Sequence, residues 1–247
     1  MPISSGYWEP DAGLVFLAGG RLFVMDGALS VPLAGAPTGV VAVATLAGSH
    51  VAASVDGLYV QADGGWEQIV AHSGLRSLVS NGSRLASLTS DGGVFSYENG
   101  TATTISTVIR PTLLEIGSDG TLYGAAGSRL LVEDGGVLQE VMLPGPFIQA
   151  LGHTPDGDLI YVRAPDVCSV RQNRCTRQFL VDVNTRLYPD VNGALAMPGI
   201  FGSLYLLSSI DSASEVRIPV LPTAVWAGGG GRIALGTDGG GVYLGGP

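Results

Sequence analysis

The final residues of the chain, "RIALGTDGGGVYLGGP" (232–247), place a glycine-rich turn between two apolar runs, the second of which bears an aromatic residue. The same pattern occurs earlier as "HVAASVDGLYVQADGG" (50–65) and "RLASLTSDGGVFSYENG" (84–100). In each copy Asp-Gly separates the two runs. Because Asp and Gly tolerate the positive φ of tight hairpins, the pattern indicates a unit of antiparallel strands that is repeated along the chain.

Short strands are predicted throughout. The apolar runs are short and rich in Val, Leu, Ile and Tyr, and no helical i, i+3, i+4, i+7 pattern continues over about 12 residues. Asx-Gly pairs, which favour hairpin turns, separate the runs. Their first residues are Asp56, Asp63, Asn81, Asp91, Asn99, Asp119, Asp134, Asp156 and Asp238. The sequence therefore predicts an all-β fold built as a meander of hairpins.

The turn that would follow the first strand of each unit recurs with a regular period. The candidate glycines are Gly13, Gly48, Gly82, Gly120, Gly157, Gly202 and Gly230. Their spacings are 35, 34, 38, 37, 45 and 28 residues. We interpret the long spacing as a loop insertion at 163–177 and the short one as a degenerate unit at 201–221. A four-stranded unit of this length, repeated six or seven times, predicts a β-propeller.

One unit illustrates the expected order of strands. "LRSLVSNG" (75–82) would be innermost, followed outward by "SRLASLTSDG" (83–92), "GVFSYENG" (93–100) and the Thr-rich "TATTISTV" (101–108). The change from apolar to polar runs fits this order, because packed neighbouring units cover the inner strands most completely. We expect a single propeller domain over residues 1–247, with four-stranded antiparallel blades and seven blades rather than six.

The two ends of the chain leave the closure of the ring open. The last unit supplies "AVWAGGGG" (224–231), "RIALGTDGG" (232–240) and "GVYLGG" (241–246), which is one strand short of a full blade. The N-terminal "PISSGYWEP" (2–10) would either complete that blade or form the inner strand of the first one. The second alternative leaves the last blade with three strands.

Two turns carry a resemblance to known propellers. "GTDGGGVY" (236–243) and "TSDGGVFSYENG" (89–100) resemble the repeat of two-component-regulator-type propellers, whose turn reads Thr-Asp-Gly-Gly-Gly-aromatic. Residues 89–93, Thr-Ser-Asp-Gly-Gly, are also similar to the first part of the Asp-box turn of sialidase-like propellers. These motifs are structural, so the resemblance implies the fold and no particular activity.

The composition restricts the possible partners. Hydrophobic residues make up 46% of the chain, charged residues only 13%, and the formal net charge is −9. Every basic residue is Arg, a bias that suggests a bacterium with a GC-rich genome. No basic run is present, so we expect neither a nucleic-acid partner nor an acidic lipid surface. The most apolar stretch, 39–53, is interrupted by Ser49 and His50, so no membrane span is predicted.

Two cysteines, Cys168 and Cys175, lie in the polar stretch "DVCSVRQNRCTR" (166–177). We expect a disulfide that closes a short loop, which is typical of an oxidising compartment. The alternatives are a reduced pair in the cytosol and half of a metal site, although no His lies within the loop. With the disulfide we predict a secreted, periplasmic or cell-surface protein. The start "MPI" lacks signal-peptide features, so we expect the leader to be missing from this sequence.

Several aspartates and histidines have both a functional and a structural interpretation. Asp56, Asp91 and Asp238 would follow second strands as an acidic rim or Ca²⁺ site, but one carboxylate per turn favours ordinary turn chemistry. The three histidines share no metal-binding spacing, so we expect no metal site. His153 would lie on an inner strand, either as a ligand or catalytic group beside the channel or as a hydrogen-bonded core residue.

One face of a propeller carries both the connections between blades and the turns between second and third strands. We expect a binding surface on this face. Its candidate residues are His72, Arg76, Arg110, Tyr188 and Asp190. We also expect the 163–177 stretch, with Arg171 and Arg174, to serve as a basic docking loop for an acidic partner. The alternative for that loop is a hairpin stapled for stability.

No catalytic or cofactor motif is recognisable. The chain has no Gly-x-Ser-x-Gly nucleophile elbow and no Gly-x-Gly-x-x-Gly that opens a helix, so we expect no enzyme activity and no cofactor. We predict a non-catalytic recognition or scaffolding propeller that binds a protein or another extracellular ligand through one rim face and the Arg-rich loop. Two alternatives stay open: a carbohydrate-active hydrolase or lyase of the propeller type, and the ligand-sensing domain of a larger surface or signalling protein.

Overall fold

The chain folds into short β-strands joined by tight turns. The computed structural model describes residues 3–9, 13–26, 29–62, 65–141, 146–181, 185–189, 195–218, 222, 224–227, 233–237 and 242–245. Among these residues the one helical element is the 3₁₀ turn η1 (Ile200–Gly202), and no helix is long and apolar enough to cross a membrane. The predicted all-β class is confirmed.

Consecutive strands form antiparallel sets in which each strand pairs with the next one along the chain. The first three sets are β1 (Ile3–Glu9), β2 (Gly13–Ala18), β3 (Arg21–Asp26) and β4 (Leu29–Pro32); β5 (Val40–Leu46), β6 (Ser49–Ser54), β7 (Gly57–Ala62) and β8 (Gly65–Ala71); and β9 (Val79–Ser80), β10 (Arg84–Leu88), β11 (Val94–Glu98) and β12 (Thr101–Thr107). The last of these matches the predicted strand order of residues 75–108.

The remaining sets continue the same meander. They are β13 (Leu113–Ile116), β14 (Leu122–Ala126), β15 (Arg129–Asp134) and β16 (Val137–Glu140); β17 (Ala150–His153), β18 (Leu159–Arg163), β19 (Asp166–Ser169) and β20 (Arg174–Thr176); β21 (Tyr188–Pro189), β22 (Leu195–Pro198), β23 (Ser203–Ser209) and β24 (Ser212–Arg217); and β25 (Ala224–Ala227), β26 (Ile233–Gly236) and β27 (Val242–Gly245).

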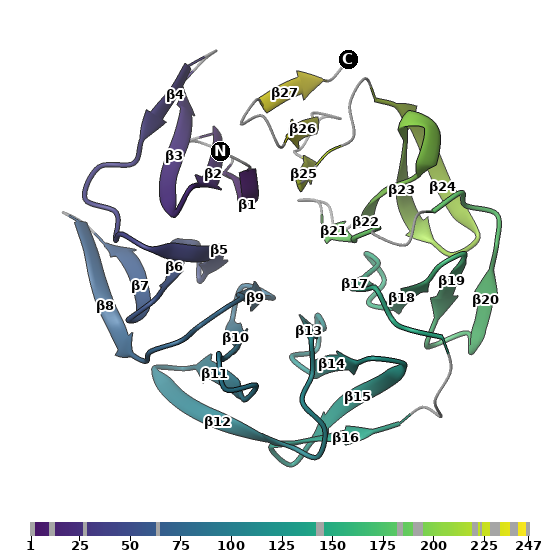
Figure 1. Cartoon of the computed structure of the whole chain (residues 1–247), viewed down its shortest axis with the longest axis horizontal. Helices are drawn as coiled ribbons and strands as arrows, with labels where there is room; N and C mark the ends of the chain where they lie inside the picture. Colours follow the sequence, from purple (N-terminus) through teal and green to yellow (C-terminus); the bar gives the residue numbers. More distant parts are fainter. Residues whose placement is uncertain are drawn as a thin grey trace.

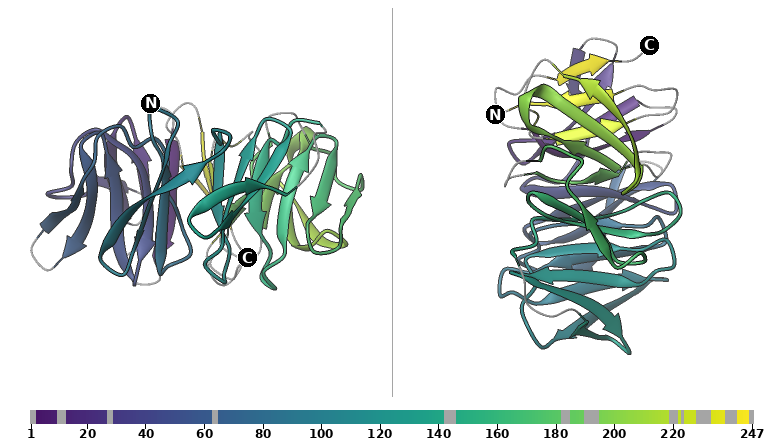
Figure 2. Two further views of the ribbon diagram at one scale, coloured as in Figure 1. Left: turned by 90° about the horizontal axis from the view of Figure 1, so that it is seen from below. Right: turned by 90° about the vertical axis from the view of Figure 1, so that its right-hand side faces the viewer.

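The sets are the blades of a β-propeller, arranged around a central axis (Figure 1). The first strand of each blade lies nearest the axis. These first strands contact one another in a ring that runs from β1 through β5, β9, β13, β17 and β21 to β25 and back to β1. From the side the molecule is a flattened disc (Figure 2). The total number of blades stays a prediction, because parts of the last one lie outside the described residues.

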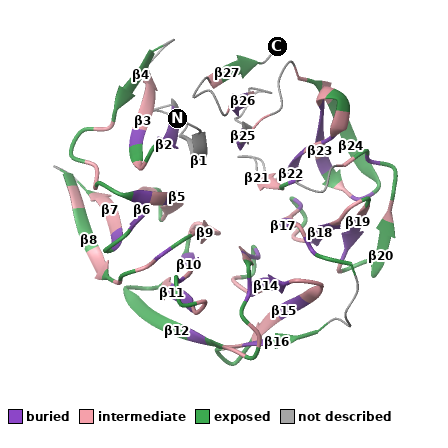
Figure 3. Cartoon of the chain, viewed as in Figure 1, coloured by how far each residue is buried: buried purple, intermediate pink, exposed green. Residues whose placement is uncertain are grey.

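Burial is greatest in the middle of each blade and least at its outer strand (Figure 3). Residues 51–53 of β6 are fully buried, whereas the first four residues of the Thr-rich strand β12 are exposed. Neighbouring blades cover both faces of the middle strands, while an outer strand has solvent on its outer side. This gradient is the physical reason for the change from apolar to Thr-rich runs within a repeat.

The hydrophobic core lies between blades rather than within them. One cluster joins Ala86 and Val94 of the β9–β12 blade to Leu122 and Leu131 of the β13–β16 blade. Another joins Ile160 of β18 to side chains of β22 and β23 in the next blade. Since no blade can bury both of its faces alone, the stability of each depends on its neighbours.

The β9–β12 and β13–β16 blades are also joined through their outer strands. Strand β12 pairs in parallel with β16, with Ser106 opposite Val137 and Thr107 opposite Leu138. The Ser106 N–H donates to the carbonyl of Gly136 at 3.1 Å. Among the described residues no other two blades are joined in one sheet. This link fixes the outer edges of the two blades relative to one another.

The structure resolves the two alternatives for the N-terminal strand. Strand β1 pairs with β2, with Trp8 opposite Leu14, and it lies beside β25 at the axis. It is therefore the inner strand of the first blade. The last blade has three strands, β25 to β27, within the described part of the chain.

The interpretation of the two irregular spacings needs correction. Gly202 lies between β22 and β23, the second and third strands of its blade, and not after a first strand. The first strand is β21 and the second is β22, and residues 190–194 lie outside the described part. The 163–177 stretch is therefore no insertion. It supplies β19 and β20, the third and fourth strands of a regular blade.

We predict that removing a core side chain between two blades destabilises the protein far more than removing an exposed one. Leu131 is fully buried and Leu29 is 72% exposed. Leu131→Ala should lower the free energy of unfolding in urea by about 2–5 kcal/mol, and the matched Leu29→Ala by no more than about 0.5 kcal/mol. Equal losses in the two variants would contradict a core that lies between blades.

Candidate functional site

The up-and-down order of strands defines two faces of the disc. Face A carries the turns between first and second strands and between third and fourth strands. It includes residues 81–83, 117–121, 154–158 and 170–173. Face B carries the turns between second and third strands and the connections between blades. It includes residues 55–56, 72–78, 89–93 and 108–112.

Three of the predicted binding residues lie on face B, in connections between blades, as expected. The His72 ring packs on Phe95 at 5.0 Å between centroids, and its Nδ1 is 2.9 Å from the carbonyl of Ser73. Arg76 and Arg110 are exposed, and neither forms a salt bridge with any described residue. Face B therefore presents two cations to solvent.

Of the other two residues predicted for this face, only Tyr188 is described. Tyr188 lies on the inner strand β21, where its side chain packs against two apolar clusters. Burial raises the pKa of the Tyr188 hydroxyl, and the nearby positive charge of Arg186 opposes this effect. Asp190 lies outside the described residues. Within the described part of the chain, the predicted binding surface on face B therefore consists of His72, Arg76 and Arg110.

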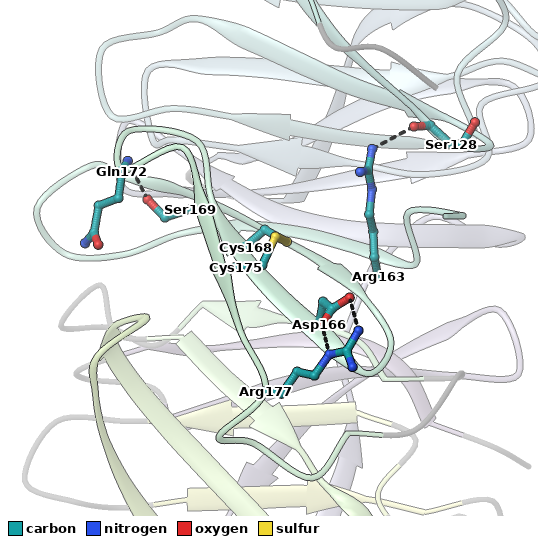
Figure 4. The surroundings of a disulfide bond; sticks show 8 residues. All are labelled: Ser128, Arg163, Asp166, Cys168, Ser169, Gln172, Cys175 and Arg177. Carbon is teal, nitrogen blue, oxygen red and sulfur yellow. Dashed lines mark hydrogen bonds and ion pairs between the residues drawn. A yellow bond between two sulfur atoms is a disulfide. The ribbon is translucent and has the colours of Figure 1, made fainter. Parts of the chain in front are cut away.

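The predicted disulfide is present in the structure (Figure 4). Cys168 on β19 and Cys175 on β20 lie directly opposite each other, with Cα atoms 4.0 Å apart. Cys168 is fully buried against the preceding β13–β16 blade, in the cluster that contains Leu130 and Tyr161. The bond therefore ties an outer strand to a buried one, which supports the stapled-hairpin interpretation.

The arginines of this hairpin are paired with carboxylates of the same protein. Arg171 Nη1 lies 2.9 Å from Asp156 Oδ2, and Arg177 Nε lies 2.5 Å from Asp166 Oδ1. Arg174 pairs with Asp211. Such exposed pairs stabilise little, but they cancel most of the local positive charge.

The hairpin also lies apart from the other predicted binding residues. Arg171 lies in the turn at face A and Arg174 directly after it, whereas His72, Arg76 and Arg110 lie on face B. The structure therefore does not bring the two halves of the predicted binding surface together.

Aspartates in the turns serve the turns themselves. Residues 89–93, 117–121 and 154–158 share one geometry, in which the first N–H donates to the fifth carbonyl and the fourth N–H donates to the first carbonyl. The third residue of each is an Asp whose carboxylate accepts a bond from inside the turn. The donors are Thr89 Oγ1 for Asp91, the Thr121 N–H for Asp119 and Thr154 Oγ1 for Asp156.

These bonds lower the pKa of all three carboxyl groups, because they stabilise the ionised form. Asp56 also has a lowered pKa, chiefly through a hydrogen bond from Tyr59. Asp238 lies outside the described residues. Within the described part of the chain no group of three or more His, Cys, Asp or Glu side chains is arranged to hold a metal ion.

A partly buried acid–base pair connects the inner strands of two blades. His153 at the end of β17 lies 3.1 Å from Glu115 on β13, measured from Nδ1 to Oε1, and the ring packs on Tyr123 at 5.4 Å. Burial raises the pKa of Glu115, while the hydrogen bond to His153 opposes the increase. The sequence singled out His153 but not its two partners, since nothing in the spacing of 38 residues marks the contact.

A polar cavity of about 580 Å³ lies between the β9–β12 and β13–β16 blades. Asn99 and Gly136 belong to turns between third and fourth strands, so the cavity lies at face A. Its lining is formed by Arg84, Ser96, Glu98, Asn99, Thr101, Thr103, Thr104, Ile105, Glu133 and Gly136. No motif marked these residues in the sequence, because they come from two repeats and join only when the blades pack.

Arg84 forms the most extensively bonded group of the cavity. Its guanidinium makes a bidentate pair with Glu133 at 2.6 and 2.9 Å, and the two side chains are only 11% and 13% exposed. It also donates to Ser96 Oγ at 2.9 Å and to the Gly120 carbonyl at 2.8 Å. The hydrogen bond to Glu133 raises the pKa of Arg84, so the guanidinium stays charged.

Comparisons with known proteins place the fold among solved structures of low sequence identity. The extracellular domain of the putative one component system BT4673 from B. thetaiotaomicron, also described as a hybrid two component system, is 16% identical, with a TM-score of 0.71. The extracellular domain of the putative hybrid two component system BT3049 is 12% identical, also at 0.71. Both alignments cover 98% of this chain but only 38% and 39% of those chains.

A third similar structure is virginiamycin B lyase from Staphylococcus aureus, 13% identical with a TM-score of 0.71 over 98% of this chain and 93% of the lyase. No family model and no curated protein matches the sequence. The chain is therefore defined by its fold as a β-propeller. These solved structures agree with the propeller fold that the turn motifs implied.

We predict that removing one partner of the Arg84–Glu133 pair strongly lowers the free energy of unfolding, and that replacing both partners lowers it much less. Arg84→Met leaves the Glu133 carboxylate buried without its partner, which should cost about 3–5 kcal/mol in urea unfolding. The double variant Arg84→Met with Glu133→Leu should recover most of that loss. Arg129→Met, at the exposed pair with Glu140, is the control and should cost less than about 1 kcal/mol. If the loss of stability in the double variant equalled the sum of the losses in the two single variants, Arg84 and Glu133 would not be energetically coupled.

We also predict that Thr89→Val raises the pKa of Asp91 toward its ordinary value, because the variant lacks the hydroxyl that stabilises the carboxylate. A lowered pKa stabilises the fold at pH values above the ordinary one, and this contribution is lost as pH falls through the folded pKa. The free energy of unfolding of the variant should therefore change less with pH in the acidic range. Carboxyl ¹³C NMR titration measures the shift. Asp119, whose main donor is the Thr121 N–H, should titrate unchanged.

Proposed function

We propose that this chain is a non-catalytic recognition domain that acts outside the cytoplasm and senses a small polar ligand. The observation that carries the proposal is the polar cavity between the β9–β12 and β13–β16 blades. Its volume lies within the range typical of small-molecule sites. Propellers host many roles, so the argument rests on the site and not on the fold.

The state of the charged groups supports recognition over catalysis. Arg84 and Glu133 are bonded to each other, which leaves neither free to exchange a proton with a ligand. A second carboxylate, Glu98, lines the same cavity, and all three residues come from second and third strands rather than from the inner strands at the axis. The Arg84–Glu133 pair is held in a fixed geometry. Such a pair suits binding, because the cavity wall does not have to rearrange when a ligand enters.

Two observations support a location outside the cytoplasm. The Cys168–Cys175 disulfide is typical of oxidising compartments. Two of the similar structures are extracellular domains of signalling proteins, of which this chain spans 38% and 39%. We propose by analogy that this chain is the sensing part of a secreted, periplasmic or cell-surface protein. Face B, with His72, Arg76 and Arg110, is proposed as the surface for a protein partner.

A second candidate is an enzyme of the lyase or hydrolase type. The specific observation in its favour is the partly buried Glu115–His153 pair near the axis, a carboxyl and imidazole within hydrogen-bonding distance. Virginiamycin B lyase shares the fold over 93% of its length. We rank this candidate second, because only one carboxylate takes part and Tyr123 covers the His153 ring.

A thermal-shift screen with product analysis distinguishes the two candidates. The intact chain is heated with sugars, amines, amino acids and glycosides in turn, and each mixture is then examined by mass spectrometry. For a sensor we expect at least one compound to raise Tm in a concentration-dependent way and to be recovered unchanged. Conversion of that compound, abolished in Glu115→Gln, would contradict the proposal and favour the enzyme.

A further inference from the structure

We infer that the cavity between the β9–β12 and β13–β16 blades binds a small aliphatic ligand that carries a protonated amine and several hydroxyl groups, such as an amino sugar. This inference deepens the proposed function and rests on it. It follows from which polar groups of the cavity remain open, from their charge and from the absence of aromatic side chains in the lining.

The N–H donors of Arg84 are almost all in use. A guanidinium has five N–H groups, and Arg84 directs two to Glu133, one to Ser96 and one to Gly120. The Ser96 hydroxyl in turn lies 3.3 Å from the Leu85 carbonyl, to which it donates. A ligand whose recognition depended on accepting hydrogen bonds, such as a phosphate or a carboxylate, would find at most one free N–H on Arg84.

The acceptors of the cavity remain open. The carboxylate of Glu98 accepts no hydrogen bond from any described residue, since Arg84 donates elsewhere. The exposed residues Thr101 and Thr103 make no side-chain hydrogen bond within the described part of the chain. Register explains why they converge, since Glu98 lies opposite Thr101 and Ser96 opposite Thr103 on paired strands. Their side chains therefore project from the same face of the blade.

The balance of charge favours a cation. Arg84 contributes one positive charge to the lining, and Glu98 and Glu133 contribute one negative charge each. The lining therefore carries a formal net charge of −1. Arg84 gives its bidentate pair to Glu133, whereas Glu98, opposite Arg84 on the paired strand, forms no salt bridge with any described residue. An ammonium group donates three hydrogen bonds and matches this carboxylate in both charge and donor character.

The remaining surface selects against flat, apolar ligands. The only large apolar side chain of the lining is Ile105, and no aromatic ring is available for stacking. The threonine hydroxyls accept and donate, so they suit the hydroxyl groups of a polyol. The parallel β12–β16 link and the Ser106–Gly136 hydrogen bond hold the two walls together beside the cavity. The site is thus preorganised, although its polar lining predicts only modest affinity.

The test compares glucosamine with glucose, which has the same ring without an ammonium group. Titration calorimetry on the whole chain measures affinity, and ¹⁵N NMR locates the site. We expect glucosamine to bind more tightly than glucose and to shift the amide signals of Glu98, Thr101 and Thr103. Glu98→Gln removes the charge but keeps the shape, and it should weaken glucosamine binding about tenfold while changing glucose binding little.

Glu67→Gln is the matched control, because Glu67 is an exposed carboxylate on the outer strand β8 of another blade. It should leave glucosamine affinity unchanged. Both positions are exposed, so both variants should fold, and equal Tm values check this. Equal loss in the two variants would show nonspecific attraction to an acidic protein and would overturn the inference.

Two further results would overturn the inference without touching the proposed function. One is glucosamine binding whose NMR shifts map to face B or to the Glu115–His153 pair. The other is that glucosamine does not bind at millimolar concentration, although another compound of the thermal-shift screen raises Tm and is recovered unchanged. Failure of every compound in that screen would instead count against the proposed function itself.

Discussion

The contact of one blade with the next is the constraint on which the rest of this structure depends. A four-stranded sheet with apolar residues on both faces cannot bury them alone, and each blade here completes the core of its neighbour. The ring must therefore close, and it does so through contact of β1 with β25 at the axis. This requirement explains a chain that is 46% hydrophobic yet has no α-helix within its described residues.

The same constraint decides where polar chemistry is possible. The middle strands lie between apolar layers, and the two charged pairs described here lie near the ends of strands where two blades meet. Arg84 and Glu133 meet at face A, and Glu115 and His153 meet between two inner strands. Each pair joins side chains of two blades. Function in this protein is therefore expected between blades, where a cavity is lined by two repeats at once.

The Arg-rich hairpin shows how tertiary pairing changes the meaning of a sequence feature. Read along the chain, 163–177 is a basic stretch on an acidic protein. In space, Arg171 and Arg174 meet Asp156 and Asp211, which are 15 and 37 residues away. The positive charge is largely cancelled, and the hairpin becomes two ordinary strands tied by a disulfide. Local composition predicted the chemistry of the side chains correctly, but not their partners.

The sequence by itself determined the local features of this protein. Turn geometry at residues 89–93, the all-β class, the outer Thr-rich strand and the pairing of Cys168 with Cys175 depend on residues close together in the chain, so spacing and propensity were enough. The tertiary structure decided what is separated by one repeat or more. The place of β1, the Arg84–Glu133 pair 49 residues apart and the cavity exist only when blades pack, because no local pattern records which faces meet.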